Sequence, residues 1–496
     1  MAKNIMIQGT ASSVGKSLLT AALCRILKDQ GYKVAPYKSQ NMALNSYITR
    51  DGKEIGRAQV VQAEAARIEP TVEMNPILLK PTSDVGSQVI INGEVYANST
   101  AEEYYQIKPK LKKIVKEAYD KLASKFQGII IEGAGSPAEI NLRENDIVNM
   151  GLAELVDSPV ILVADIDKGG VFASIYGTIM LLEADERERI KGFIINKFRG
   201  DIELLKPGIR MIEEKIEKPC LGVVPYMQVK VDDEDSVSSR FDYQEKGNLK
   251  IGIVKLPYIS NFTDFTPLEM ETDISIRYLS SKNDFQDIDL LIIPGSKNTI
   301  NDMKYILESG INQEIYKMNK MGTPIIGICG GYQILGREIK DPDNIESSIN
   351  RIIGLSLLDI STTILKKKET KQIKGTLNKA LSICEGIEAS VISGYEIHMG
   401  RSELADNLDY AIELEDRRLD GAINDQGNVF GTYLHGIFEN DNFRDSLLNG
   451  LRKKKGISNK NEELSYKEFK ELEYNKLAKV VSENVEIETI KEIMGF

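Results

Sequence analysis

A glycine-rich loop between an apolar strand and a helix constrains this chain more than any other sequence feature. The run Asn4–Gln8 predicts a buried strand, and the stretch after the loop predicts a helix. The loop, QGTASSVGKS, contains Gly9, Thr10, Gly15, Lys16 and Ser17. Backbone N–H groups in such a loop point at phosphate oxygens, the helix N-terminus adds partial positive charge, and the lysine adds a full charge. The loop therefore predicts a nucleotide phosphate site, with the Ser17 hydroxyl as a ligand for Mg²⁺.

The spacing within this loop differs from the standard one. Five residues, Thr10–Val14, separate the two glycines, where the standard loop has four. The longer spacing is similar to that of the variant loops in dethiobiotin synthetase-like and partition-ATPase-like proteins. A glycine-rich turn with an incidental lysine is the alternative, and the strand before and helix after the loop disfavour it.

Short apolar runs alternate with helix-like stretches along the first half of the chain. The expected strands are Asn4–Gln8, Lys33–Tyr37, Gly128–Glu132, Pro159–Asp165, Gly192–Asn196 and Cys220–Pro225. The clearest helix is expected over Lys110–Phe126, with Pro109 at its start. Such alternation is typical of βαβ units, so we expect an α/β fold with a mostly parallel sheet covered by helices on both faces.

A second α/β series follows a polar stretch. Residues Val231–Gly247 are acidic and lack periodicity, which is typical of a linker. The later strands are expected over Lys250–Leu256, Asp289–Pro294, Pro324–Cys329 and Val429–Leu434. We therefore expect a P-loop domain over residues 1–230, a linker over 231–248, a second α/β domain over 249–445 and a helical C-terminal tail over 446–496.

A phosphate loop needs an acidic side chain that holds its metal ion. Glu132 ends one buried strand, and Asp165 and Asp167 follow another. Ligands of open parallel sheets bind at the carboxyl ends of the strands, so Glu132 is predicted to be a metal ligand. For Asp165, a metal role and a capping role at the strand end are equally supported. Asp146 is a further acid whose role the pattern leaves open.

A second chemical site is indicated by PIIGICGGYQILG. An apolar strand runs directly into Cys329, followed by Gly330, Gly331 and a helix. This pattern is typical of a nucleophile elbow, with cysteine in place of serine. The helix dipole stabilises negative charge on the sulfur there. A buried structural cysteine is the alternative, but the flanking glycines fit a tight turn better.

The chain has only two histidines, which makes the choice of a base simple. His435 follows an expected strand, and it is the predicted base for Cys329. His398 is the rival, with a hydrogen-bonded structural role as the alternative. The backbone N–H groups of Gly295 and Ser296 follow another strand, so they could form an oxyanion hole with that of Gly330.

Together the two sites predict a ligase supplied with ammonia by a glutaminase. ATP would convert a carboxylate into an acyl phosphate, and ammonia released from glutamine would displace the phosphate. A net charge of −11 argues against nonspecific nucleic-acid binding. No long uncharged apolar stretch predicts a membrane span. Four widely spaced cysteines suit a cytoplasmic location.

The chain resembles the cobyric acid synthase family, the glutamine-dependent amidases of cobalamin biosynthesis. The resemblance extends to about residue 445 and rests on GTASSVGKS, APYKSQNMALNSYIT, DGKEIGRAQVVQAEAA, MNPILLKP, IEGAGSPAEINL, DIVNMG, ADIDKGGVFAS, INKFRGD, LGVVPY, GICGGYQILG, GYEIHMG and GTYLHGIFEN. The related enzymes that make cobyrinic acid a,c-diamide share the architecture but lack the KSQNMALNS and EGAGSPAEINL strings.

The resemblance implies a fold and an activity. It implies a P-loop NTPase-like (dethiobiotin synthetase-like) domain followed by a class I glutamine amidotransferase-like domain. The implied reaction amidates the b, d, e and g carboxylates of adenosylcobyrinic acid a,c-diamide, a corrinoid, to give adenosylcobyric acid. ATP, Mg²⁺ and glutamine would be consumed or required.

The resemblance also implies residue roles. Cys329 would be the glutaminase nucleophile and His435 its base, and the loop from Gly9 to Ser17 would hold the ATP phosphates. By similarity to dethiobiotin synthetases, Lys38 should reach the transferred phosphate or substrate, and Asn196 should contact adenine. The candidates for a surface facing the corrinoid are Ser39, Gln40, Asn41 and Asn45, with Asp146 as a further substrate-binding candidate. A loop of solvated amides is the alternative for the first four.

One position departs from the triad amidotransferases. Those enzymes carry a glutamate two residues after the histidine, where this chain has Ile437. Glu439 is the nearest acid that follows. We therefore expect a Cys–His dyad, with Glu439 as the alternative third member.

Two other functions compete with this interpretation. One is an amidoligase with the same two domains that acts on a cell-wall lipid or on cobyrinic acid. The other is a partition-type ATPase switch with a degenerate amidotransferase domain. The intact pair Cys329 and His435 disfavours the switch, which should lack glutaminase activity.

Overall fold

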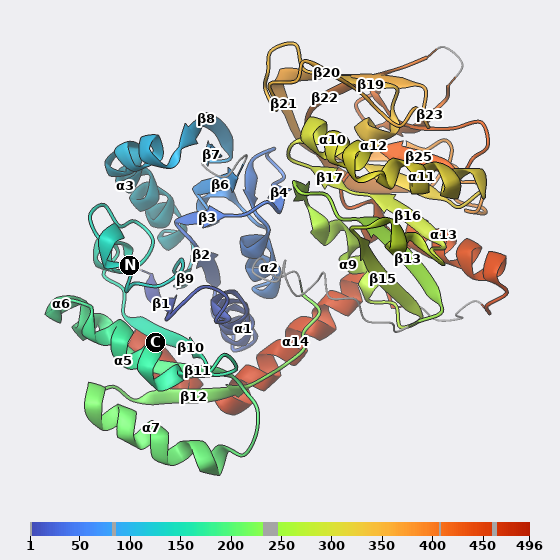
Figure 1. The fold of residues 1–496 in the computed structure, drawn as a ribbon. Helices are drawn as coiled ribbons and strands as arrows, with labels where there is room; N and C mark the ends of the chain where they lie inside the picture. The colour runs from blue at the N-terminus through green and yellow to red at the C-terminus, as the bar shows by residue number, and fades with distance from the viewer. Residues whose placement is uncertain (1, 82–85, 232–246, 406–407, 459–463) are drawn as a thin grey trace. The chain divides into compact units, whose positions relative to one another are not determined.

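The computed structural model describes residues 2–81, 86–231, 247–405, 408–458 and 464–496, which form two compact units (Figure 1). Unit 1 comprises Met1–Ala43, Glu54–Ser236 and Lys470–Phe496, and unit 2 comprises Leu44–Lys53 and Val237–Phe469. Most of the expected linker over 231–248 lies outside the described residues.

Unit 1 is built on a six-stranded parallel sheet. Its order is β12 (Cys220–Pro225), β11 (Ile190–Phe198), β10 (Val160–Asp165), β1 (Lys3–Gly9), β9 (Gly128–Glu132) and β2 (Val34–Tyr37). All six strands expected from the sequence are present, and the predicted parallel sheet is confirmed.

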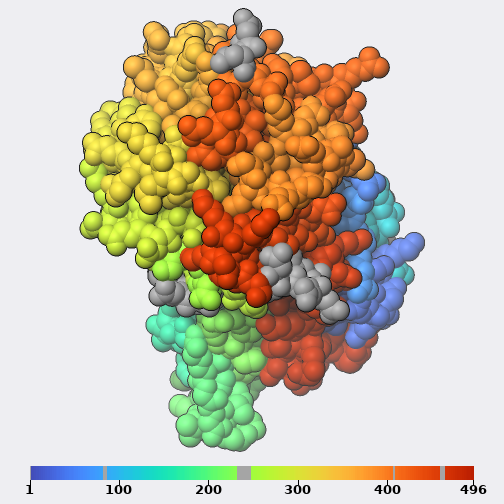
Figure 2. All heavy atoms as spheres, turned by 90° about the vertical axis from the view of Figure 1, so that its right-hand side faces the viewer, coloured from blue at the N-terminus to red at the C-terminus, as the bar shows by residue number. Residues whose placement is uncertain are grey.

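The sheet of unit 1 is apolar on both faces because alternate residues enter different cores. Ile5 and Ile7 of β1 pack in the core that contains residues of α1 (Lys16–Asp29). Met6 packs in the opposite core with residues of α3 (Ala101–Ala123). The other helices of this unit are α2 (Arg57–Ala65), α4 (Met150–Leu155), α5 (Val171–Met180), α6 (Ala184–Arg189) and α7 (Ile202–Ile216). Helix α7 forms a lobe at the surface, green in Figure 2, and exposes Leu204.

Helix α3 begins earlier than the sequence predicted. Its first residue is Ala101, and Pro109 lies inside the helix instead of at its start. The Thr100 hydroxyl accepts from the Glu103 N–H and the Glu103 carboxylate accepts from the Thr100 N–H, which forms a capping box. This capping box stabilises the start of the helix at Ala101. Pro109 therefore lies within the helix, where it removes one backbone hydrogen bond without ending the helix.

A small mixed sheet in unit 1 was not predicted. Its order is β3 (Gln40–Met42), β6 (Ile77–Pro81), β7 (Gly86–Ile91) and β8 (Glu94–Thr100). Strands β3 and β8 are mostly polar, and the apolar residues of β6 and β7 are combined with polar ones, so these strands do not stand out as continuous apolar runs.

Unit 2 contains a larger sheet with a parallel part and a mostly antiparallel continuation. The parallel part is β15 (Ile274–Leu279), β13 (Leu249–Val254), β16 (Leu290–Ile293), β18 (Ile325–Ile328) and β25 (Val429–Thr432). The continuation is β24 (Leu419–Ile423), β23 (Tyr410–Leu414), β21 (Ile360–Leu377), β19 (Glu338–Lys340) and β20 (Arg351–Ile353), and β22 (Val391–Leu404) pairs with β21. Among the described residues of this continuation, only β19 and β21 pair in parallel. The four predicted strands are confirmed. The long β21–β22 pair was not predicted.

Short elements near the sheet of unit 2 complete the fold. The helices are α9 (Thr266–Glu269), α10 (Thr299–Ser309), α11 (Ile311–Lys320), α12 (Gly330–Leu335) and α13 (Asp441–Lys455). A two-stranded antiparallel sheet joins β14 (Ile259–Ser260) to β17 (Gly295–Ser296). Strand β4 (Ser46–Ile48) also belongs to this unit, whereas β5 (Glu54–Gly56) belongs to unit 1. No helix in the described part of the chain combines the length and apolar character that crossing a bilayer requires.

The two units are not continuous in sequence. Residues 44–53, which were expected in the P-loop domain, belong to unit 2. The C-terminal residues from Lys470 belong to unit 1, so the expected tail is not a separate element. Helices α14 (Tyr466–Asn484) and α15 (Ile487–Met494) supply Leu477 and Ile490 to the core that contains α1.

This packing predicts that the C-terminal helices stabilise unit 1. Leu477 is buried in that core, whereas Leu472 on the same helix is exposed. We expect Leu477→Ala to lower the free energy of unfolding of unit 1 by about 2–5 kcal/mol and Leu472→Ala to change it by less than about 0.5 kcal/mol. Calorimetry of the full chain measures the change in unfolding free energy. The transition of unit 1 is identified as the one whose midpoint temperature rises when ATP is added. Equal effects of the two variants would contradict it.

Candidate active sites

The phosphate loop of unit 1 has the geometry that the sequence predicted. Gly15 adopts a left-handed conformation with φ 98°, and α1 begins at the next residue. A Cβ atom at this position would lie 2.2 Å from Nδ2 of Asn196, so both the conformation and the space require glycine. Lys16 is buried, and its Nζ donates to the carbonyl oxygens of Ala11 (3.1 Å) and Gly135 (3.3 Å).

Glu132 is the centre of a polar cluster beside this loop. Its carboxylate accepts from Ser17 Oγ (2.8 Å), Lys38 Nζ (2.9 Å) and Gln62 Nε2. Burial alone would raise the pKa of this carboxyl. The charge of Lys38 and the three hydrogen bonds outweigh burial and hold the pKa of Glu132 below its ordinary value. Glu132 is therefore a buried anion that Lys38 compensates.

The oxygens of Ser17 and Glu132 suit a magnesium ion. Both are hard ligands, and they lie 2.8 Å apart at the carboxyl end of β9. Within the described ranges, no group of three or more His, Cys, Asp or Glu side chains could hold a metal by itself. Mg²⁺ does not need such a group beside nucleotide, because it takes one or two protein ligands with phosphate and water. Asp165 instead accepts from Lys197 Nζ at 2.9 Å and from the backbone N–H of Asp167.

Two residues predicted to touch ligands support the protein itself. The side-chain amide of Asn196 donates to the Val14 carbonyl at 2.8 Å, which holds the phosphate loop against β11. The carboxylate of Asp146 accepts backbone N–H groups of Val148, Asn149 and Gly151 at the start of α4. Asp146 is thus occupied in capping a turn and helix.

The four polar residues expected to face a corrinoid are mostly interior. Ser39, Asn41 and Asn45 are buried. Ser39 Oγ donates to the Ile147 carbonyl, Asn41 Nδ2 donates to Gln59 Oε1, and Gln40 Oε1 accepts from Tyr104. Asn45 lies in unit 2, where its Oδ1 accepts from the Phe262 N–H. These contacts favour an internal supporting role over a substrate-facing surface.

Cys329 occupies the nucleophile elbow predicted for unit 2. It lies between β18 and α12 with φ 51° and ψ −106°, a strained conformation for a residue that is not glycine. A Cβ atom on Gly331 would lie 1.9 Å from the Ile293 carbonyl oxygen, and one on Gly330 would lie 2.8 Å from the Ser296 nitrogen. Backbone atoms cannot move aside, so both glycines are required for this turn.

The predicted oxyanion-hole residues lie together near the elbow. The contact between Gly330 and Ser296 brings the start of α12 to strand β17. A Cβ atom on Gly295 would lie 3.2 Å from Cε1 of His435, so this strand also borders the base. Asp302 accepts from Ser296 Oγ and from the Tyr258 N–H, and burial raises the pKa of Asp302 to about 7. Asp302 thereby fixes the loop that would stabilise an oxyanion.

His435 has an acidic partner, so the expectation of a Cys–His dyad is wrong. Its Nδ1 donates to Asp264 Oδ2 at 2.7 Å, and the other Asp264 oxygen accepts from the Gly436 N–H at 3.0 Å. Glu439, the alternative suggested by the sequence, lies in a short 3-10 helix that follows His435. The Nδ1 atom of His435 is therefore oriented by Asp264, 171 residues away in sequence.

The electrostatics of this group favour a protonated imidazole. Complete burial by itself would lower the pKa of His435. The charge and hydrogen bond of Asp264, followed by those of Cys329, outweigh burial and raise the pKa of His435 to about 10. The elbow and the base are neighbours, because strand β17 approaches Gly330 on one side and the His435 ring on the other, and Asp264 holds that ring at Nδ1. Such a group can attack an amide carbon with sulfur and protonate the leaving nitrogen.

His398 has the structural role given as its alternative. Its Nδ1 contacts the Gly400 carbonyl at 2.8 Å, and its ring stacks on Tyr433 with centroids 3.9 Å apart. The choice of His435 over His398 therefore agrees with the geometry. Sequence reasoning missed Asp264 because nothing in SNFTDFTP distinguishes this acid, which precedes the first motif of the domain.

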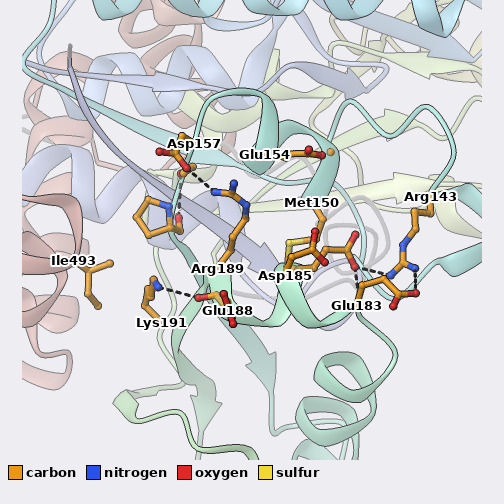
Figure 3. A pocket seen from close by; sticks show the side chains of 14 residues that line it. Arg143, Met150, Glu154, Asp157, Glu183, Asp185, Glu188, Arg189, Lys191 and Ile493 are labelled. Atoms are coloured by element: carbon orange, nitrogen blue, oxygen red, sulfur yellow. Dashed lines mark hydrogen bonds and ion pairs between the residues drawn. The ribbon is translucent and has the colours of Figure 1, made fainter.

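A cavity of about 740 Å³ in unit 1 is a separate feature (Figure 3). It lies where β10 and β11 begin, lined by Pro159 and Lys191 among others, whereas ligands of parallel sheets bind at the carboxyl ends. Its cations contact neighbouring oxygens, with Arg189 on Asp157, Arg143 on Glu183 and Glu186, and Lys191 on the Glu188 carbonyl. We do not assign this cavity to the nucleotide or to glutamine.

Comparisons with known proteins agree with two functional units. Residues 5–236 match the family model of the CobQ/CobB/MinD/ParA nucleotide binding domain, and residues 250–443 match that of the CobB/CobQ-like glutamine amidotransferase domain. The chain is 54% identical to proteins named cobyric acid synthase from Thermoanaerobacter sp. (strain X514) and Clostridium botulinum (strain 657 / Type Ba4), and 53% identical to one from Clostridium acetobutylicum. These matches cover 99–100% of this chain and 98–100% of the relatives.

The Asp264–His435 contact predicts a large effect on the histidine pKa. In Asp264→Asn the negative charge is lost while burial remains, so the pKa of His435 should fall from about 10 to below its usual range. The imidazolium should then be lost at neutral pH, and glutaminase turnover should fall about 10²-fold or more. NMR titration of ¹⁵N-histidine resolves this because the chain has two histidines.

Glu439→Gln is the matched control for this titration. It removes the nearest following acid but leaves the Nδ1 contact intact, so the pKa of His435 and the glutaminase turnover should remain close to those of the unaltered protein. A large loss in Glu439→Gln with little loss in Asp264→Asn would contradict the prediction, because it would show that Glu439 and not Asp264 orients the imidazole.

Proposed function

Because the chain belongs to the cobyric acid synthase family, we propose that it amidates the b, d, e and g carboxylates of adenosylcobyrinic acid a,c-diamide to give adenosylcobyric acid. The chain is a glutamine-hydrolysing ligase with a nucleotide-binding domain. The observation that carries the proposal is the buried Asp264–His435 pair near the Cys329 elbow, in the same polypeptide as the phosphate loop.

Glutamine hydrolysis would begin with attack of the Cys329 sulfur on the side-chain amide carbon. N–H groups of the Gly295–Ser296 strand and of Gly330 would stabilise the oxyanion. The His435 imidazolium would protonate the leaving nitrogen to release ammonia and leave a thioester. Neutral His435 would then accept a proton from the water that hydrolyses the thioester to glutamate.

The ligase reaction would use the phosphate loop of unit 1. The corrinoid carboxylate would attack the γ-phosphorus of ATP and form an acyl phosphate and ADP. Ammonia would then attack the acyl carbon, form the amide and release phosphate. Ser17 and Glu132 would hold Mg²⁺, which neutralises phosphate charge when bound. Lys16 would contact the phosphates, and Lys38 would move from Glu132 to the transferred phosphate or substrate.

Three features support this function over an ATPase switch with a degenerate second domain. The Cys329 elbow has the required backbone conformation. The buried imidazole has a carboxylate partner. The glycines that allow the oxyanion strand to approach the elbow are present. A protein that had lost glutamine hydrolysis would have no need to preserve this strained arrangement.

The division into two sites predicts separable losses of activity. We expect Cys329→Ala to abolish amidation with glutamine and to leave amidation with ammonium salts within about twofold. The sulfur is needed only to release ammonia, and it lies in unit 2. Both amidation activities are measured from the mass of the product after incubation with the a,c-diamide, ATP, Mg²⁺ and either glutamine or an ammonium salt. Cys384→Ala, in the same unit, is the matched control and should retain both activities. Glutamine-driven amidation by Cys329→Ala would refute the assignment.

The phosphate loop predicts a loss that ammonia cannot rescue. Lys16 lies on the loop carbonyls where phosphate oxygens would bind. Removing one such electrostatic contact should slow phosphoryl transfer by roughly 10²–10³-fold. Lys16→Ala should therefore reduce amidation equally with glutamine and with ammonia. Lys28→Ala, at the other end of α1, should not. Near-normal amidation by Lys16→Ala with ammonia would contradict the phosphate-binding role and indicate that the loop is only a structural turn.

A further inference from the structure

A ten-residue segment of the N-terminal half of the chain belongs to the glutaminase unit. Residues Leu44–Lys53 form part of unit 2, while the chain before and after them, through Ala43 and from Glu54, forms part of unit 1. The segment contains β4 and a turn in which the Thr49 N–H donates to the Lys53 carbonyl. Nothing in the proposed chemistry uses it directly, so its contacts within unit 2 are informative.

One end of the segment is bonded to the loop that carries Asp264. Asn45 Oδ1 accepts from the Phe262 N–H at 3.0 Å, and the Ser46 N–H donates to Asn261 Oδ1 at 3.1 Å. Asn261 has φ 51° and directly precedes the 3-10 helix Phe262–Phe265, in which Asp264 lies. Asn45 and Ser46 therefore hold the turn that presents the carboxylate to His435.

The middle of the segment contacts the tyrosine that stacks on His435. Tyr395 OH donates to the Ser46 carbonyl at 3.3 Å, and its ring lies 5.3 Å from that of Tyr47. The Tyr395 ring also stacks on the His435 ring at 5.3 Å with an interplanar angle of 19°. The backbones of Tyr395 and His435 exchange two hydrogen bonds, of 3.2 and 2.9 Å. The segment thus reaches both groups that orient the imidazole.

The segment is anchored in unit 2 by further contacts with β21 and β22. Gln372 Nε2 donates to Tyr47 OH (2.8 Å) and to the Ile48 carbonyl (2.7 Å), and Thr370 Oγ1 donates to the Gly52 carbonyl (3.0 Å). Ile48 is buried in a small apolar cluster with Tyr395. These contacts fix the segment along its length.

The stretches of chain before and after the segment each contain a side chain that contacts Glu132. Lys38 lies six residues before Leu44, and Gln62 lies nine residues after Lys53. Both side chains donate to the carboxylate of Glu132, which is the proposed Mg²⁺ ligand. Binding of nucleotide and metal there would compete for these oxygens, so it would change the partners of Lys38 and Gln62. The loaded and empty ATP site would therefore hold the two flanks differently.

We propose that residues 44–53 are a positioning segment that sets the geometry of Asp264 and His435 and makes glutamine hydrolysis respond to the state of the ATP site. The inference rests on the proposed function of the two sites and adds the connection between them. The residues of the segment act through the Asp264 turn and through Tyr395.

The size of the effect follows from the geometry of proton transfer. A displacement of about 1 Å in a catalytic group can cost about 10²-fold in rate. Asn45→Ala removes the acceptor of the Phe262 N–H and loosens the Asp264 turn. We expect glutaminase kcat to fall about 10- to 100-fold with a smaller change in KM for glutamine, because the base and not the substrate site is displaced.

The test measures four quantities on the full chain. They are glutaminase rate without ATP, glutaminase rate with ATP, Mg²⁺ and the a,c-diamide, amidation with saturating ammonium, and the pKa of His435 by ¹⁵N NMR. In the unaltered protein we expect ATP and corrinoid to raise the glutaminase rate. In Asn45→Ala we expect that increase to disappear, the pKa of His435 to fall with the signal of His398 unchanged, and ammonium-driven amidation to stay within twofold.

A second variant and a control keep the outcome decisive. Gln372→Leu removes the donor to Tyr47 and Ile48 from the opposite side, so it should reproduce the loss if Asn45→Ala does not fold. Asp51→Asn changes an exposed residue of the same turn and should alter none of the four quantities. The proposal is overturned if both variants keep the response to ATP. It is also overturned if ammonium-driven amidation falls in parallel with the glutaminase rate. If instead the proposed function is wrong, the unaltered protein itself will lack glutaminase or ligase activity, which separates that outcome from failure of the positioning proposal.

Discussion

The buried contact between Asp264 and His435 is the constraint on which unit 2 depends. An isolated carboxylate or imidazolium in the interior costs several kcal/mol. The Asp264 carboxylate, 2.7 Å from Nδ1, is the main group that raises the pKa of His435 against burial. The contact therefore stabilises the charged state of the base and fixes its orientation at the same time. Gly436, which donates its N–H to the same carboxylate, ties the backbone beside His435 into the arrangement.

Unit 1 follows the same physical rule at its own site. Glu132 is buried at the end of β9, and Lys38 supplies the compensating charge. Both sites thus hold a buried acid with a cationic partner, but the consequences differ. At Asp264 the pair is part of the working site. At Glu132 three donors occupy the carboxylate, so a metal ion bound there would compete with them.

Features set by local sequence were predictable, and features set by distant contacts were not. The six strands of the unit 1 sheet, four of the five parallel strands of unit 2, the phosphate loop and the Cys329 elbow each follow from apolar runs and glycines within a few residues. Strand β15 was not predicted. The partner of His435 could not be found this way, because Asp264 lies 171 residues earlier and no local pattern marks it. The same reason explains Asn45. Its neighbours suggested a polar surface, whereas its hydrogen bond is to Phe262, 217 residues away.

The exchange of segments between the units changes what the two-domain description means. If residues 1–230 and 249–445 were independent domains, a linker would be the only covalent connection and the activities would be coupled by diffusion of ammonia alone. Instead, residues 44–53 leave and rejoin unit 1 within a short span of chain, and residues 470–496 return to it from unit 2. Residues 470–496 pack in the core that contains α1, and Ile48 of residues 44–53 packs with Tyr395. Residues 44–53 are also bonded to the turn that carries Asp264. In the proposed coupling, a change of partners at Glu132 would reach that turn through the short stretch of chain between Lys38 and Asn45. Coupling is in this sense a property of the chain connectivity.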